Sequence, residues 1–188
     1  MARSKRSGSS TGFHIKPIGR VRNRIEPEGS PPEGSQLARG GKGWRNPASW
    51  GEAVSELVVD KNLAEGLDGI EEYSHVTVYY WSGDESGKLP WGQEFSIKFH
   101  PAGREEFPLV GVFATRCPVR PNSICATSVE LLERKGNMLR VKGLDTFDGT
   151  PIIDIKPYMP YYDSVPDAKI AGWMSDLAKF LLTGSTTA

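Results

Sequence analysis

Apolar and polar residues alternate along several short stretches of this chain. In His75–Trp81, Val76 and Val78 alternate with polar and aromatic residues, and in residues 137–144, Leu139 and Val141 share one face opposite two basic residues. A period of two is typical of β-strands that bury one face. The pattern therefore predicts a strand in each stretch.

The same reasoning predicts further strands between clusters of turn residues. They are expected at 13–24 with a break at Pro17, and at 53–60, 94–100, 109–114, 127–134 and 151–155. Lys135-Gly136 predicts the hairpin turn that joins 127–134 to 137–144. We expect 94–100 to be half-buried through Phe95, Ile97 and Phe99, and 109–114 to be fully buried.

Two segments have a different pattern. The glycine-rich residues 62–73 predict a helix or turn. After Val165-Pro166-Asp167, apolar residues recur at helical spacing and predict a helix with one apolar face. That face comprises Ile170, Trp173, Met174, Leu177 and Leu181.

About eight short strands and one terminal helix define a mainly β protein. Many short strands with turn signals favour a small antiparallel β-barrel. The 188 residues fit one domain at 13–182, with a long loop at about 26–50. Residues 1–12 are expected to be a disordered basic tail and 183–188 a frayed end. No Gly-x-Gly-x-x-Gly follows a predicted strand, so a Rossmann cofactor site is not supported.

Composition narrows the classes of function. The formal net charge is zero, so any contact with RNA must come from local patches. The basic tail is either a solubilising leader or a weak arm for RNA phosphates. The two cysteines lie outside any cluster with metal-ligand spacing, and no apolar run approaches the ~20 residues of a membrane span. The sequence thus predicts no metal, no membrane span and a cytoplasmic location.

Three loops carry the candidate chemistry. Arg116 and Arg120 lie four residues apart beside a Pro-Asn turn, and Asp148-Gly149 follows the predicted hairpin. Arginine presents a planar fork to carboxylate or phosphate, and prolines stiffen the loops around it. Each loop alone also fits a plain solvated turn. In the long loop, Lys42, Trp44 and Arg45 form either a substrate loop, with the indole stacking on a base, or part of a linker.

Two runs of sequence combine these loops into a recognisable pattern. Residues 114–122 read Ala-Thr-Arg-Cys-Pro-Val-Arg-Pro-Asn, and 144–158 read Leu-Asp-Thr-Phe-Asp-Gly-Thr-Pro-Ile-Ile-Asp-Ile-Lys-Pro-Tyr. Both resemble motifs of the TsaA-like (TrmO) family of tRNA methyltransferases, and a weaker resemblance extends from about residue 15 to 168. The chain departs from the first motif at Cys117, Ser123 and Cys125, where the family has Ser, Pro and Gly.

The resemblance implies a small β-barrel that binds S-adenosylmethionine, usually as a homodimer. It implies methylation of the exocyclic nitrogen of threonylcarbamoyladenosine beside the tRNA anticodon. It carries cofactor contacts over to Arg116, Ala126, Asp148, Gly149, Thr150 and Pro151. Two family contacts have no match: a Pro-Arg-Gln run is absent near the long loop, and a strand-end His is replaced by Gly83.

The remaining roles stay open at this stage. Arg120 and Asn122 either read the substrate base or hold their own loop. The accepting nitrogen must lose a proton, and Asp154, His100 and Tyr158 are candidates to take it. The intact motif at 148–158 favours an enzyme. The alternatives are a non-catalytic barrel that binds S-adenosylmethionine or RNA, or a methyltransferase with a different substrate.

Overall fold

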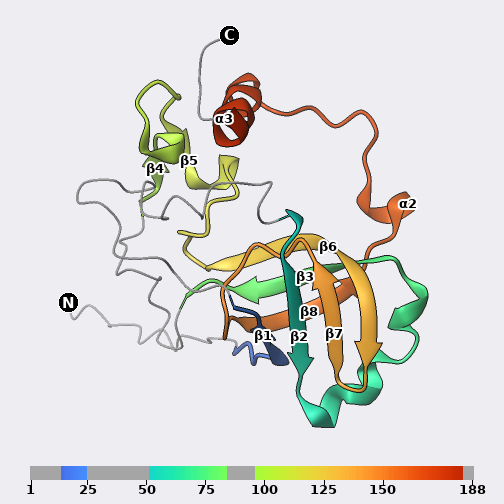
Figure 1. The fold of residues 1–188 in the computed structure, drawn as a ribbon. Coiled ribbons are helices and arrows are strands. Elements are labelled where there is room, and N and C mark those ends of the chain that lie inside the picture. Colours follow the sequence, from blue (N-terminus) through green and yellow to red (C-terminus); the bar gives the residue numbers. More distant parts are fainter. Residues whose placement is uncertain (1–13, 25–50, 84–95, 184–188) are drawn as a thin grey trace, which may run out of the picture.

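The computed structural model describes residues 14–24, 51–83 and 96–183 (Figure 1). Within these ranges six antiparallel strands close into a barrel in the order β1-β2-β7-β6-β3-β8. The remaining two strands, β4 and β5, form a separate small sheet. The predicted antiparallel barrel with a C-terminal helix is therefore confirmed, but the barrel has six strands and not about eight. The barrel strands are β1 (Gly19–Arg22), β2 (Val54–Val59), β3 (His75–Trp81), β6 (Ile124–Lys135), β7 (Met138–Lys142) and β8 (Pro151–Pro157).

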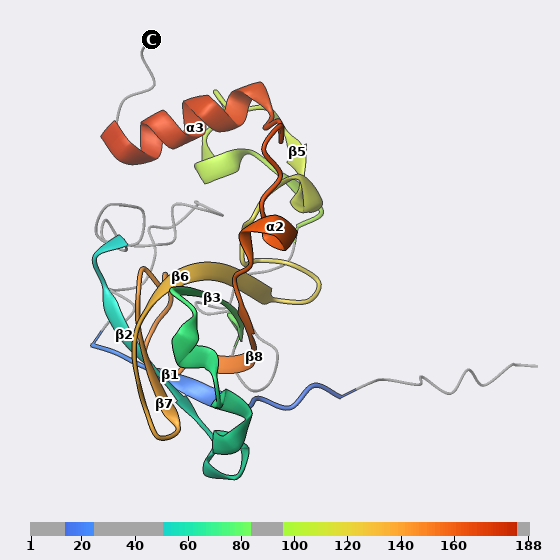
Figure 2. The same ribbon diagram turned by 90° about the vertical axis from the view of Figure 1, so that its right-hand side faces the viewer.

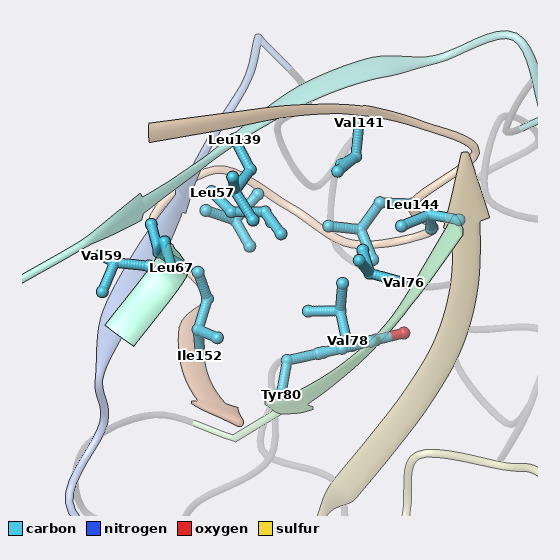
Figure 3. Packing of buried hydrophobic residues seen from close by; sticks show 12 residues of the cluster. Leu57, Val59, Leu67, Val76, Val78, Tyr80, Leu139, Val141, Leu144 and Ile152 are labelled. Atoms are coloured by element: carbon cyan, nitrogen blue, oxygen red, sulfur yellow. The ribbon is translucent and has the colours of Figure 1, made fainter. Parts of the chain in front are cut away.

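The barrel interior is filled by the apolar face of each strand. In β3 the side chains of Val76, Val78 and Tyr80 point inward, whereas the residues between them stay half-buried. Leu139 and Val141 of β7 are fully buried, as their alternation predicted. Figure 3 shows these side chains packed with Leu57 and Ile152 around one centre. Alternation thus predicted the residues that β3 and β7 contribute to the core.

Two 3-10 helices close one end of the barrel. They are η2 (Lys61–Leu67) and η3 (Ile70–Glu72), in the segment where we predicted a helix or turn. The Leu67 side chain is buried against the core, and Gly69 between the two helices has a positive φ of 84°. The Arg134 guanidinium on β6 donates to the Leu67 carbonyl at 3.0 Å and to the Asp68 carboxylate at 2.6 Å. This arginine fixes the closed end to the barrel wall.

The first strand is shorter than the predicted 13–24. β1 begins at Gly19, two residues after Pro17, which lacks the N–H that a ladder needs. A Cβ on Gly19 would lie 2.2 Å from the carbonyl oxygen of Val58 on β2. Only glycine allows the two backbones to approach so closely.

The β6–β7 hairpin differs from its prediction by one residue. The strands end and begin at Lys135 and Met138, so the turn is Gly136-Asn137 and not Lys135-Gly136. Gly136 takes the positive φ, 59°, that such a turn requires. β6 also begins earlier than predicted, and its register shifts between Leu131 and Glu133 at a bulge. The bulge lets one long strand bend around the barrel.

The remaining elements form a second lobe, which we call the α3 lobe (residues 96–114 and 172–183). It contains β4 (Lys98–Phe99), η5 (Pro101–Gly103), β5 (Val110–Gly111), η6 (Val112–Ala114) and the helix α3 (Gly172–Thr183). Figure 2 shows α3 lying over β5, apart from the barrel. The Phe107 and Phe180 rings meet edge to face, with centroids 6.2 Å apart, and Arg104 lies 4.3 Å over the Phe180 ring.

Three expectations for this lobe were wrong. Residues 109–114 are not one buried strand, because a 3-10 helix follows Gly111 and leaves Phe113 77% exposed. Ile97 is 70% exposed, although Phe99 on the same predicted face is buried. The last helix begins at Gly172, so Ile170 lies before it, in a connection that runs exposed from α2 (Pro160–Asp163). Phe95 lies outside the described residues.

Candidate functional site

The sequence-predicted loops gather at the end of the barrel opposite η2, which we call the open end. Here β1, β3 and β7 finish, and β2, β6 and β8 begin. Pro151 of β8 pairs with Arg20 of β1, and Trp81 of β3 pairs with Ile124 of β6. The connections at 112–123 and 143–150 therefore meet at one end of the barrel.

The Asp148–Pro151 turn is anchored on β1. The Asp148 carboxylate accepts the Asn23 backbone N–H at 2.8 Å, and the Gly149 N–H donates to the Val21 carbonyl at 2.9 Å. Gly149 has a φ of 77°, and its carbonyl accepts from the Arg20 guanidinium at 3.1 Å. The fold therefore holds the turn in place. The conformational entropy of ordering it is lost on folding and not on ligand binding.

Arg116 lies on the other side of the open end. Its guanidinium donates to the backbone carbonyl of Ala126 on β6, at 2.5 Å, and its side chain is exposed. The structure therefore brings together two residues that the resemblance placed in one cofactor site. A guanidinium has five N–H donors, so this bond uses only part of its capacity.

Arg120 has a different environment, although it lies only four residues away. Its guanidinium donates to the carbonyl of Thr115 at 2.8 Å and to that of Cys117 at 3.3 Å, and it lies 5.8 Å from the Phe113 ring centre. These contacts support the loop-holding role that the sequence left open for Arg120. Asn122, in contrast, is exposed.

The 112–123 loop is also tied to the end of β3. The Ser82 backbone N–H donates to the Ser123 carbonyl at 2.9 Å, and the Ser82 hydroxyl donates to the same carbonyl at 3.2 Å. Gly83, which stands where the family has a His, is buried directly after this contact. The strand end that carries a side chain in the family carries none here.

Sequence reasoning missed a polar cluster at this end, formed by Tyr80, Thr127 and Asp145. The Thr127 hydroxyl donates to Asp145 Oδ1 at 2.6 Å, and the Tyr80 hydroxyl donates to the same oxygen at 3.1 Å. Burial, followed by the negative charge of Asp145, raises the pKa of Tyr80 well above its usual range. The signal was available, since Tyr80 falls on the inward face of its strand and Asp145 belongs to the second motif.

The three predicted proton acceptors lie elsewhere. Asp154, in the middle of β8, accepts from the Lys156 ammonium at 2.5 Å and from the Ile155 N–H at 2.9 Å. His100 belongs to the α3 lobe, where its Nδ1 lies 2.7 Å from the Phe107 carbonyl. Tyr158 follows β8 at the closed end, and its N–H donates to the carbonyl of His75, the first residue of β3. None of these contacts is to Arg116 or Asp148.

The remaining predictions concern the long loop, the two cysteines, and metal and membrane features. Lys42, Trp44 and Arg45 lie outside the described residues. Cys117 and Cys125 are both half-buried, and burial raises the pKa of Cys125. In the described part of the chain, no three His, Cys, Asp or Glu side chains are grouped to hold a metal ion. Among the same residues, no helix has the length and apolar character that crossing a bilayer requires.

A closed barrel with rigid, polar loops at one open end belongs to the class of small binding barrels. Residues 40–164 match the family model described as the tRNA-methyltransferase O N-terminal domain. The chain belongs to this family, which confirms the resemblance drawn from the two motifs.

Relatives of known description agree with this assignment. An Archaeoglobus fulgidus S-adenosyl-L-methionine-binding protein is 36% identical over 151 residues, which are 80% of this chain and 93% of that protein. The Escherichia coli tRNA (adenine(37)-N6)-methyltransferase is 30% identical over 164 residues, 84% of this chain and 63% of that protein. The crystal structure of TrmO from Pseudomonas aeruginosa matches with a TM-score of 0.57 at 30% identity and covers 86% of this chain and 62% of that one.

Several relatives are longer than the matched region. A second Archaeoglobus fulgidus relative is 44% identical over 121 residues, but these make up only 30% of its length, and a Pyrococcus abyssi relative is matched over 55% of its length. The chain therefore matches less than two thirds of the length of each of these two relatives.

Proposed function

We propose that this chain is an S-adenosylmethionine-dependent methyltransferase that acts on tRNA. One observation carries the proposal: the Arg116–Ala126 contact and the Asp148–Pro151 turn lie at the same end of one barrel. Relatives of this chain are named S-adenosyl-L-methionine-binding proteins and tRNA (adenine(37)-N6)-methyltransferases. The intact motif at 148–158 supports the same activity here.

The donors and acceptors of the site fit the cofactor. S-adenosylmethionine supplies a methyl group on a sulfonium, which is already activated for transfer. Arg116 would hold its carboxylate, since the guanidinium is exposed and keeps donors beyond the Ala126 bond. Asp148, with the backbone of Gly149 and Thr150, would accept from the amine or the ribose, because its carboxylate is exposed and already oriented by Asn23. Pro151 stiffens the end of this turn.

For the acceptor we propose the exocyclic nitrogen of threonylcarbamoyladenosine beside the tRNA anticodon. The loop that Arg120 holds presents Asn122 to solvent at the open end, where it can contact a base. Lys42, Trp44 and Arg45 would supply phosphate and stacking contacts. Positioning and exclusion of water are the main contributions of the protein, because the methyl donor needs no further activation.

We also propose that the protein works as a homodimer in the cytoplasm, where tRNA is modified. The apolar face of α3 supports the dimer, since Trp173, Met174, Leu177 and Phe180 are only partly buried. A second copy would cover this face. Sedimentation that gives a mass near 20.6 kDa at all concentrations would contradict the dimer.

The test of function has two parts. Calorimetric titration with S-adenosylmethionine is expected to show one site per chain. Incubation with tRNA that carries threonylcarbamoyladenosine, followed by mass spectrometry of its nucleosides, is expected to show a gain of one methyl group. Matched tRNA that lacks the threonylcarbamoyl group is the control, and methylation of both would assign a different substrate. Cofactor binding without any methyl transfer would favour the non-catalytic barrel.

A further inference from the structure

The cluster of Tyr80, Thr127 and Asp145 is the feature of the open end to which neither the motifs nor the relatives assign a role. It lies between the two proposed cofactor segments. Thr127 directly follows Ala126, whose carbonyl Arg116 holds, and Asp145 precedes Asp148 by three residues. All three side chains are linked, because Thr127 and Tyr80 both donate to Asp145.

We propose that Asp145 is the proton acceptor of the reaction and that Thr127 and Tyr80 orient its carboxylate toward the methyl-accepting nitrogen. This inference rests on the proposed methyltransferase function. It replaces Asp154, His100 and Tyr158, which the structure engages in contacts away from the open end.

The geometry of Asp145 favours this role. Both hydroxyls donate to Oδ1, so the carboxylate is fixed by one oxygen. A carboxylate offers about four acceptor positions over its two oxygens, and the Asp145 side chain is exposed. The carboxylate is therefore held by Oδ1 and accessible at the mouth of the barrel, where a substrate N–H can reach it.

The backbone on both sides of Asp145 is also fixed. Thr146 is buried, its hydroxyl lies 3.0 Å from that of Thr150, and its carbonyl accepts the Asn23 amide at 3.0 Å. Leu144 is buried in the core. A proton acceptor needs to stay within hydrogen-bond reach of its donor. Here the fold supplies that placement before substrate binds.

The two hydroxyl donors hold the carboxylate in one orientation. Tyr80 is buried at 5% exposure and keeps its own proton, so it acts as a donor and does not compete for the substrate proton. A buried tyrosine hydroxyl also requires a partner, and Asp145 is that partner.

The step balances without another reactant. The nitrogen lone pair forms the new N–C bond to the methyl group, while the C–S bond breaks and its electron pair stays on sulfur as a neutral thioether. The N–H becomes acidic as the N–C bond forms. Its proton passes to the Asp145 carboxylate, which then releases it to water.

The decisive variant is Asp145→Asn, because the amide oxygen still accepts from Thr127 and Tyr80 but cannot take a proton. We expect kcat for tRNA methylation to fall by about 100-fold or more, the range for loss of a general base. The KM for tRNA, the cofactor Kd and the melting temperature are expected to stay as in the wild type. Thr127→Val, which keeps the carboxylate but removes its 2.6 Å donor, should lower kcat by a smaller factor.

Asp60→Asn is the matched control, since Asp60 is exposed and lies before η2 at the closed end. Asp145→Asn with wild-type kcat would overturn the inference. A parallel loss of melting temperature or of cofactor binding would also overturn it, because it would assign Asp145 a structural role. If the wild type binds S-adenosylmethionine but methylates no tRNA, the proposed function fails, and this inference fails with it.

Discussion

Replacement of Arg116 by alanine tests the cofactor site most directly. In the structure this side chain is exposed and donates to one backbone carbonyl, that of Ala126. The change removes the guanidinium without creating a cavity in the core. Arg116→Ala therefore tests cofactor binding without a large change in folding stability.

The expected magnitudes follow from these contacts. An exposed side chain away from the core alters stability by only about 0.5 kcal/mol on replacement. A hydrogen bond to a charged group contributes about 1.5–3 kcal/mol. If Arg116 pairs the cofactor carboxylate, Arg116→Ala should therefore raise the Kd for S-adenosylmethionine about 10- to 150-fold, since 1.4 kcal/mol is a factor of ten.

Arg116→Lys provides the finer measurement. In the proposed complex the Arg116 side chain donates to the Ala126 carbonyl and also to the cofactor carboxylate. A guanidinium forks between two acceptors, whereas an ammonium acts as a point charge. Lysine should therefore recover only part of the lost affinity. Calorimetry on wild type, Arg116→Ala and Arg116→Lys measures this order.

Arg140→Ala is the matched control for these variants. Arg140 is a half-buried arginine on β7 whose guanidinium lies 3.5 Å from the Glu133 carboxylate, on the barrel wall. Its replacement should leave the cofactor Kd unchanged. Unchanged affinity in Arg116→Ala would refute our assignment. A fall in RNA affinity alone, with a shallower salt dependence, would move Arg116 to a phosphate contact.

Three further predictions concern the scaffold. Gly19→Ala should destabilise the fold by about 1–3 kcal/mol in urea unfolding, as overpacking does, because its Cβ would lie 2.2 Å from the Val58 carbonyl oxygen. Arg134→Met should lower the melting temperature and speed amide exchange in η2, since it removes the bond to the Leu67 carbonyl. Tyr80 has a pKa raised above its ordinary 10.0, so the unfolded chain loses this proton first and stability falls as pH rises past that value. Tyr80→Phe should flatten this alkaline decline, measured by urea unfolding across alkaline pH, at a cost of about 1 kcal/mol near neutrality.

The barrel was predictable because its signal is local. Alternation in His75–Trp81 gave the strand with the bounds that the structure shows, and the inward faces of β3 and β7 followed from it. A strand that buries one face alternates apolar and polar residues, and this period of two is visible in the sequence. Two features were not predictable in this way: the close approach of Gly19 on β1 to β2, and the bulge after Leu131 in β6. Both depend on the partner strand and not on the local sequence.

The α3 lobe was predicted least well for the same reason. Phe113 and Ile97 look like buried strand residues, yet both are largely exposed. No periodicity shows that a 3-10 helix replaces the strand after Gly111, because this choice depends on the packing of a small, irregular lobe. The helix start moved from Asp167 to Gly172, since the apolar Ile170 fitted the helical spacing by chance.

The candidate site was predicted in part. Arg116, Ala126 and Asp148 were named from motifs, and the fold brings their segments to one end of the barrel. We chose the candidate proton acceptors by residue type. Residue type alone does not show where a side chain lies in the fold. Asp145 was passed over because its partners, Thr127 and Tyr80, lie on other strands. Only the register of β3 against β6 puts those partners beside each other.

The two ends of the barrel have different roles, one in stability and the other in binding. At the closed end Leu67 enters the core and Arg134 ties η2 to β6, so this end contributes stability. At the open end the hydrogen bonds of Asp148 and Arg120 go to backbone groups, and they hold loops in place without covering them. Substitutions at the closed end should therefore alter folding first, and those at exposed side chains of the open end should alter binding first. The scaffold and cofactor variants described above test this division on one protein.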